Sequence, residues 1–210
     1  MTRSQKNAMD LYWHTYGIDY CETLVELPLD YSSVTLEIGI GNGDALTTMA
    51  AADPDGLYLG IDVHEPGIGR CLNQVHRRHL ANVRLIMHDA IEVMQQMLPA
   101  ACCDRILLFF PDPWPKKRHR KRRIVNTLFR DLVQRCLKPG KCIHIATDWR
   151  DYAEVIAEQF LADARFLNRG DASGFAERPD YRPRTHFEQR GRRLGHGVWD
   201  LIFVKAPDSS

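Results

Sequence analysis

The sequence predicts an α/β fold with a largely parallel, doubly wound sheet. From residue 34 onward, short apolar runs alternate with segments of helical periodicity. Glycine, proline and aspartate, which are typical of turns, follow most of the apolar runs. Strands that alternate with helices form parallel sheets covered on both faces and joined by right-handed crossovers. Ligands bind such sheets beyond the carboxyl ends of the strands, so functional residues are expected there.

The individual elements follow from the same patterns. Strands are predicted at residues 34–38, 57–63, 83–87, 105–110, 142–146 and 198–204. Helices are predicted at residues 44–52, 69–79, 90–97, 124–137 and 149–160. The polar, Gly- and Pro-rich residues 168–184 are expected to form a surface loop or lid. We expect an N-terminal arm, residues 1–33, followed by a single domain, residues 34–210.

Composition excludes several classes of protein. The chain has 210 residues, of which 44% are hydrophobic and 26% charged, which is typical of a globular protein. The longest strongly apolar run, residues 106–110, is too short to span a bilayer, and residues 1–19 lack the apolar core of an export signal. The 6 cysteines form no Cys-x-x-Cys pair, which indicates reduced thiols. We therefore expect a cytoplasmic protein with no membrane association.

The positive charges are concentrated in two segments. Lys and Arg number 28 against 27 Asp and Glu, yet residues 116–123 (KKRHRKRR) hold seven of the positive charges. Residues 178–193 contain six arginines. Concentrated basic segments on an otherwise acidic chain are typical of proteins that bind polyanions such as nucleic acids. The alternative is a solvated helix face or loop, although aromatic residues in and beside both segments favour the first interpretation.

A glycine-rich turn follows the first predicted strand of the domain. Its pattern is Glu37-x-Gly39-x-Gly41-x-Gly43, and glycine lets the backbone turn tightly and approach a ligand closely. The dinucleotide fingerprint G-x-G-x-x-G would require a third glycine at Asp44 or Leu46, so an NAD site is excluded. An acid two residues before the first glycine is instead the pattern of S-adenosylmethionine-dependent methyltransferases. A purely structural turn is the alternative.

Acidic residues also end the next two strands. Asp62 lies 21 residues after Gly41, where a carboxylate would accept hydrogen bonds from ribose hydroxyls. Asp89, followed by Ala90, ends the third strand and would contact an adenine, cap the next helix, or do both. Together with Glu37, these acids would suit a ligand with a ribose, amino donors and a sulfonium charge.

The fourth and fifth strands end in residues that suit a substrate. Asp112 stands between two prolines in Phe110-Pro-Asp-Pro-Trp114, and the prolines would hold its carboxylate on a stiff loop. Lys116 and the basic residues after it would bind phosphates, and Trp114 would stack on a base. Asp148 follows the fifth strand, and capping of the next helix is its alternative role.

The order and spacing of six segments resemble the bacterial tRNA (guanine-N7-)-methyltransferase family over residues 34–204. These segments are LEIGIGNGD, IDVHEPGIG, HDA, FPDPWPKKRHRKRRIV, ATDW and RPRTHFEQRGRRLGHGVWDL. The resemblance implies a Rossmann-like class I S-adenosylmethionine-dependent methyltransferase. Such an enzyme would transfer a methyl group from S-adenosyl-L-methionine to N7 of the variable-loop guanine, position 46, of tRNA.

The resemblance also implies a role for individual residues. The cofactor-binding positions would be Glu37, Gly39, Gly41, Asp62, Asp89 and Ala90. Asp112 would be the catalytic residue, and the substrate-binding positions would be Lys116, Asp148 and the segment from Thr185 to Glu188. At the position of Asp62 the family more often has Glu, and the side chain of Asp62 is one methylene shorter.

Two other functions and several properties stay open at this point. A methyltransferase that acts on another RNA or on protein would share most of these features, and so would a non-catalytic RNA-binding module on the same fold. No metal site is expected, because Cys71, His76 and His79 have no fourth ligand at a suitable spacing. Nothing in the sequence distinguishes a monomer from a homodimer.

Overall fold

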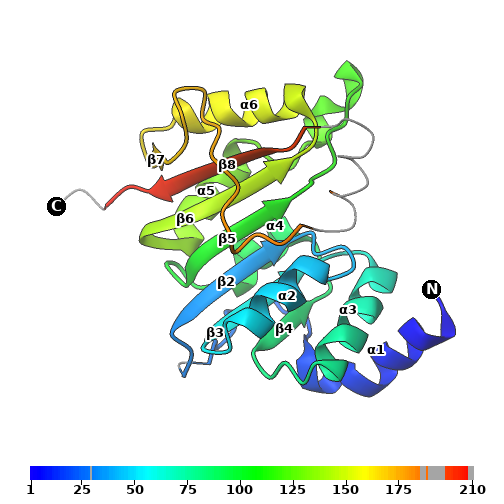
Figure 1. Cartoon of the computed structure of the whole chain (residues 1–210). Helices are drawn as coiled ribbons and strands as arrows, with labels where there is room; N and C mark the ends of the chain where they lie inside the picture. Colours follow the sequence, from blue (N-terminus) through cyan, green and yellow to red (C-terminus); the bar gives the residue numbers. More distant parts are fainter. Residues whose placement is uncertain (29, 185–187, 189–196, 208–210) are drawn as a thin grey trace.

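The computed structural model describes residues 1–28, 30–184, 188 and 197–207, and its strands form one sheet of eight (Figure 1). The strand order is β1-β4-β3-β2-β5-β6-β8-β7. The strands span Gly17–Ile18 (β1), Ser33–Ile38 (β2), Gly56–Ile61 (β3), Val83–Ile86 (β4), Cys103–Phe109 (β5), Leu137–Thr147 (β6), Phe166–Asn168 (β7) and Trp199–Lys205 (β8).

Each of the five predicted helices corresponds to a helix of the structure, with starts that differ by up to four residues, and an N-terminal helix and a 3₁₀ helix are additional. The helices span Arg3–Tyr16 (α1), Asp44–Ala52 (α2), Glu65–Arg77 (α3), Ala90–Glu92 (α4), Thr127–Cys136 (α5) and Arg150–Leu161 (α6), with a π-helical turn at Val93–Met97 and a 3₁₀ helix at Lys117–Arg122. Helix α5 begins later than expected because the Asn126 side chain accepts a hydrogen bond from the Phe129 N–H and so caps the helix. The π turn also makes the predicted helix 90–97 irregular.

Parallel pairing extends across the sheet from β1 to β6, and β8 then runs in the opposite direction, while β7 at the edge runs with β6. β2 pairs in parallel with β3 on one side and with β5 on the other. β8 pairs antiparallel with both β6 and β7. The prediction of a largely parallel, doubly wound sheet is therefore confirmed. The strand order reverses between β2 and β5, which places the expected ligand crevice at the carboxyl ends of these two strands.

Two apolar cores lie on the two faces of the sheet, and alternate residues of β5 contribute to each of them. Ile106 and Leu108 pack with residues of α5 and α6 on one face. Leu107 and Phe109 pack with residues of α2 and α3 on the other. This alternation is the side-chain period of a strand, and burial on both faces explains the continuously apolar sequence of β5.

Helix α1 is an element that the sequence analysis did not anticipate. Ala8 is buried, and the Tyr12 ring stacks on the His76 ring of α3 with 3.9 Å between ring centroids. The division into residues 1–33 and 34–210 stays a prediction. Within the described part of the chain, no helix is both long enough and apolar enough to cross a membrane.

The predicted loop at residues 168–184 has a buried anchor. β7 ends at Asn168, and the residues after it form a loop in which Ala176 makes an isolated bridge to Asp200 of β8. Arg182 is only 1% exposed. The segment is thus a loop as expected, but it is tied into the fold through Arg182 instead of lying wholly on the surface.

Candidate active site

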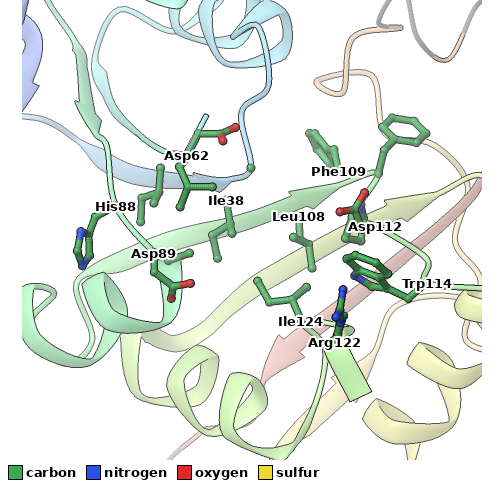
Figure 2. A pocket seen from close by; sticks show the side chains of 16 residues that line it. Ile38, Asp62, His88, Asp89, Leu108, Phe109, Asp112, Trp114, Arg122 and Ile124 are labelled. Carbon is green, nitrogen blue, oxygen red and sulfur yellow. The ribbon is translucent and has the colours of Figure 1, made fainter. Parts of the chain in front are cut away.

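A cavity of about 510 Å³ lies at the carboxyl ends of β2, β3, β4 and β5. Figure 2 shows Asp62 and Asp89 on one side of it and Asp112 and Trp114 on the other, with apolar side chains between them. The lining residues are Ile38, Gly39, Ile61, Asp62, Val63, His88, Asp89, Ala90, Leu108, Phe109, Phe110, Pro111, Asp112, Trp114, Arg122 and Ile124.

The predicted site residues divide into two groups. Those that line the cavity are Gly39, Asp62, Asp89, Ala90 and Asp112. The predicted residues that lie outside its lining are Glu37, Gly41, Lys116, Asp148 and Glu188. Thr185 lies outside the described residues. The fold thus brings together residues from four strand ends that are far apart in the sequence.

The glycine turn has the conformation that its sequence predicts. Gly39, Gly41 and Gly43 have φ angles of +73°, +55° and +78°, the left-handed region that favours glycine. Gly43 is also sterically required, because a Cβ atom there would lie 2.3 Å from Cys71 Sγ.

Asp62 holds this turn in place. Its Oδ2 accepts a hydrogen bond of 2.8 Å from the Gly41 N–H, and its Oδ1 accepts one of 2.8 Å from the His64 N–H. The carboxylate therefore joins the loop after β2 to the loop after β3. Each oxygen keeps a second lone pair, with which the carboxylate can accept hydrogen bonds from hydroxyls of a ligand in the cavity.

Glu37 lies beneath the glycine turn and has an unsatisfied carboxylate. It is 2% exposed, and its Oε2 has no hydrogen-bond partner among the described residues. Burial, followed by the nearby charges of Asp62 and Asp44, raises the pKa of Glu37 to about 8. A buried acid with a free oxygen beside two other acids fits a ligand that brings a positive charge. The residues present therefore fit S-adenosylmethionine, which carries both a sulfonium and an ammonium group.

Asp89 caps α4 and lines the cavity at the same time. Its Oδ1 accepts hydrogen bonds from the Ile91 and Glu92 N–H groups. The capping role that the sequence left open is therefore confirmed, and capping does not exclude contact with a ligand. His88 also lines the cavity, and its ring stacks on Tyr20 with 3.6 Å between centroids. Sequence reasoning missed this pair, although His88 directly precedes the acid that it singled out.

The loop that carries Asp112 is constrained at both ends. Phe110 and Trp114 have φ angles of +53° and +40°, which are unusual for residues with a side chain. The Phe110 N–H donates to the Ala146 carbonyl of β6 at 2.7 Å. Asp112 itself is exposed and lines the cavity. Strain of this kind persists where the surrounding structure enforces it, and it often marks a functional site.

Trp114 contacts two side chains of the basic run 116–123. The Arg122 guanidinium lies 5.0 Å from the Trp114 ring centroid, and the His119 ring meets it edge-on at 5.8 Å. Arg122 and Trp114 both line the cavity, whereas Lys116 is exposed outside it. The basic run therefore extends from the rim of the cavity onto the surface.

Asp148 follows β6, but it does not cap the next helix. Trp149 is the N-cap residue of α6, and no side chain caps this helix. The Trp149 N–H donates instead to Thr147 Oγ1 at 3.2 Å. The capping alternative for Asp148 is therefore wrong, because the helix begins one residue too late for it.

Glu188 belongs to a buried network of charged side chains. Its Oε2 accepts a hydrogen bond of 2.6 Å from Arg182 Nη1, and Arg182 Nη2 donates to Asp200 Oδ2 at 3.1 Å. Asp200 Oδ1 lies 2.7 Å from His144 Nε2, and the Tyr181 hydroxyl lies 2.9 Å from His144 Nδ1. Glu188 is 3% exposed. Its carboxylate therefore fixes the chain at this point, and its role in substrate binding stays a prediction.

The bonding of His144 defines its protonation. Burial lowers the pKa of His144, which favours the neutral ring. A carboxylate can only accept, so Nε2 carries the proton toward Asp200 while Nδ1 accepts from the Tyr181 hydroxyl. No pattern in the sequence indicates this network, since its members are spread over residues 144–200.

The fold and the site define a class I S-adenosylmethionine-dependent methyltransferase, and comparisons with known proteins agree. A family model described as "Putative methyltransferase" matches residues 31–201. Among solved structures, the 16S rRNA methyltransferase KamB is similar, with a TM-score of 0.58 and 16% identity, covering 85% of this chain and 90% of that one. A 16S rRNA (adenine(1408)-N(1))-methyltransferase from Catenulisporales acidiphilia, solved with its cosubstrate SAM, has a TM-score of 0.54 and 17% identity, covering 90% and 96%.

Curated relatives identify the family within this class. The tRNA (guanine-N(7)-)-methyltransferase of Yersinia pseudotuberculosis is 48% identical over 208 residues, covering 98% of this chain and 87% of the relative. The enzyme of the same name from Nitrosospira multiformis is 47% identical and covers 98% and 90%. The chain belongs to the tRNA (guanine-N(7)-)-methyltransferase family, and its cofactor is S-adenosyl-L-methionine. The resemblance noted in the sequence is thereby confirmed.

Proposed function

We propose that this protein transfers a methyl group from S-adenosyl-L-methionine to N7 of the variable-loop guanine, position 46, of tRNA. The proposal rests on one observation. Two of the acids predicted to bind the cofactor and the predicted catalytic residue lie on opposite sides of one cavity. Asp62 and Asp89, which follow β3 and β4, lie on one side, and Asp112 lies on a constrained loop on the other. The names of the curated relatives supply the substrate class.

The half of the cavity formed by β2, β3 and β4 would hold the cofactor. The turn at Gly39 and Gly41 lets the backbone approach it closely. Asp62 and Asp89 would accept hydrogen bonds from its ribose and amino donors, and Glu37 would neutralise a positive charge beneath the turn. When bound, S-adenosylmethionine supplies an electrophilic methyl group.

The half formed by β5 and the loop after it would hold the guanine. Guanine N7 has a lone pair and no proton, so the reaction does not require a general base, and catalysis depends on alignment. The N1–H and the amino group of guanine are donors, and the Asp112 carboxylate can accept from both. Asp112 would thus select guanine over adenine, hold it in place, and stabilise the positive charge that develops on the ring.

The tRNA backbone would bind outside the cavity. Lys116 and the exposed part of the basic run would contact phosphates, and Trp114 would stack on an unstacked base at the rim. Asp148 and the segment 185–188 would complete the substrate surface, with Glu188 fixed by Arg182. A tRNA substrate also assigns the reaction to the cytoplasm.

Nucleoside analysis tests the proposal directly. The protein is incubated with an unmodified tRNA transcript and isotope-labelled S-adenosylmethionine, and the digested nucleosides are separated by mass spectrometry. We expect labelled 7-methylguanosine, and no label in a matched transcript in which the guanine at position 46 is replaced by adenine. Label in another nucleoside would show a different RNA specificity. RNA binding without label in any RNA or protein substrate would show a non-catalytic module.

A further inference from the structure

Arg123 differs from the rest of the basic run because its side chain is buried. Its side chain is 5% exposed, whereas that of Arg120 is 46% exposed. Arg123 Nε donates a hydrogen bond of 2.7 Å to the carbonyl oxygen of Pro113, the residue directly after Asp112. A buried arginine bonded to backbone cannot at the same time neutralise a phosphate on the surface.

The same guanidinium reaches the first turn of α6, which follows β6. Arg123 Nη2 donates to Asp151 Oδ2 at 3.0 Å, and Asp151 lies in the first turn of α6. The guanidinium also lies over the ring of the buried Tyr152, 4.4 Å from its centroid. Asp148 lies just before this helix. Arg123 therefore bonds to the loop that carries Asp112 and to the helix that begins directly after the Asp148 turn.

The composition of the Asp112 loop explains why it needs an external donor. Proline occupies positions 111, 113 and 115, and proline has no backbone N–H with which to close a turn. Two residues of the loop, Phe110 and Trp114, have left-handed backbone conformations. A loop that has few donors of its own and a strained backbone keeps its geometry only if neighbouring groups hold it.

We propose that Arg123 is a positioning residue, which fixes the Asp112 loop relative to the Asp148 turn and does not contact the tRNA backbone. This inference rests on the proposed function, because it assigns a role to the loop that would bind guanine. Arginine suits the role since its planar fork bonds a carbonyl and a carboxylate together, whereas lysine offers a point charge.

The test compares Arg123→Lys with a matched control, Arg130→Lys. Arg130 makes the same pair of bonds, to a carboxylate and a backbone carbonyl, at Asp163 and Gln159, outside the cavity lining. For Arg123→Lys we expect kcat to fall about tenfold to a hundredfold, the loss typical of a misplaced reacting group, while KM for tRNA changes less than twofold. Arg130→Lys should retain both constants.

Salt dependence separates positioning from phosphate contact. Neutralised phosphates set the slope of log affinity against log salt concentration, and removing one contact lowers its magnitude by about 0.7 to 0.9. Because Arg123→Lys keeps the charge, Arg123→Met is the variant for this measurement, and we expect an unchanged slope. A flatter slope, or a raised KM with an unchanged kcat, would overturn the proposal.

A second variant and a structural readout keep the test independent of the proposed function. Asp151→Asn removes the carboxylate partner at a half-exposed position, so it should fold even where Arg123 variants do not. In Asp151→Asn and in Arg123→Lys, we expect hydrogen exchange to accelerate in peptides covering residues 114–119 and 148–153. Exchange in the same peptides of Arg130→Lys should not change. Unchanged exchange would contradict the anchoring role. Absence of tRNA methylation by the wild-type protein, with exchange altered as expected, would contradict the proposed function alone.

Discussion

Asp62 and Gly41, which follow two neighbouring strands, are joined by a hydrogen bond of 2.8 Å from the Gly41 N–H to Asp62 Oδ2. The second oxygen of the same carboxylate accepts from the His64 N–H. Asp62 thereby shapes the glycine turn besides lining the cavity. Its short side chain suits this double task, because both bonds go to backbone close to its own position.

Asp62→Asn should weaken cofactor binding. An amide places an NH₂ group against one of the two backbone donors, so one hydrogen bond is replaced by an unfavourable contact. A hydrogen bond to a charged group contributes about 1.5–3 kcal/mol, so we expect the Kd for S-adenosylmethionine to rise about tenfold to a hundredfold in a calorimetric titration. Asp44→Asn, on the neighbouring α2, serves as the control for loss of charge alone. Equal effects of the two variants would mean that Asp62 acts through its charge.

Binding of S-adenosylmethionine should release a proton from Glu37. The pKa of this residue is raised to about 8 in the free protein, so at pH 6.5 its carboxyl is protonated, and a cationic ligand favours the ionised form. The Kd should therefore fall as the pH rises toward 8, by at most tenfold per pH unit, and become constant above it. Calorimetry at pH 6.5 in buffers of different ionisation enthalpy measures the released proton.

The matched variant for this measurement is Glu37→Gln, which should bind without proton release. S-adenosylhomocysteine keeps the ammonium group but lacks the sulfonium charge, so proton release with this compound would identify the ammonium as the partner of Glu37. Wild-type binding with no proton exchange at pH 6.5 would contradict the linkage.

The same raised pKa has a consequence for the free protein. An unfolded chain loses the Glu37 proton near pH 4.5, whereas the folded protein keeps it up to about pH 8. The unfolded state therefore binds fewer protons between these values, and the contribution of Glu37 to the free energy of unfolding decreases as the pH rises through this window. Thermal unfolding of Glu37→Gln should show a smaller decrease over the same range than the wild-type protein.

Asp112 should act through hydrogen bonds and charge and not through removal of a proton. Asp112→Asn would keep one acceptor but turn an NH₂ group toward a guanine donor, so kcat/KM should fall about tenfold to a hundredfold or more. Cofactor affinity and the melting temperature should be retained, since the side chain is exposed outside the sheet core. Single-turnover methyl transfer to tRNA, with a parallel cofactor titration, measures both. Wild-type rates would show that Asp112 is only a turn residue.

The exposed lysines of the basic run should carry phosphate contacts. Lys116 and Lys117 are exposed, and they directly follow the loop that carries Asp112. Their joint replacement by alanine should lower the magnitude of the slope of log affinity for tRNA against log salt concentration. The expected change corresponds to the loss of up to about two phosphate contacts. Replacement of Lys6 and Arg70 by alanine is the control for total charge. An unchanged slope in the Lys116/Lys117 variant would mean that these residues are a solvated surface.

The sequence was informative where function depends on local pattern. Acids at strand ends and a glycine turn are recognisable because neighbouring residues supply the context, and parallel strands bring their carboxyl ends to one edge. For this reason the positions of Gly39, Asp62 and Asp112 around one cavity could be anticipated. The reversed direction of β8 could not, since an apolar strand has the same pattern in either orientation.

Contacts between residues far apart in the sequence explain why two groups of buried polar residues were not predicted. His144, Arg182 and Asp200 meet only after β6 and β8 pair, and none of them stands in a pattern that predicts burial. Arg123 stands among exposed cations, so its burial depends on Asp151 and on the carbonyl of Pro113, which no local pattern links to it. Buried polar groups of this kind are defined by their partners.

β8 is the last of the described strands in chain order, and this order bears on how the protein is made. A chain is synthesised from its N-terminus, so β2 to β5 are complete long before Trp199–Lys205 emerges. Until then β6 has an unpaired edge, and Arg182 lacks its Asp200 partner. Translation that stops before Trp199 would therefore release a chain with an intact glycine turn and an open sheet edge, which is a substrate for aggregation and proteolysis and not a weaker enzyme.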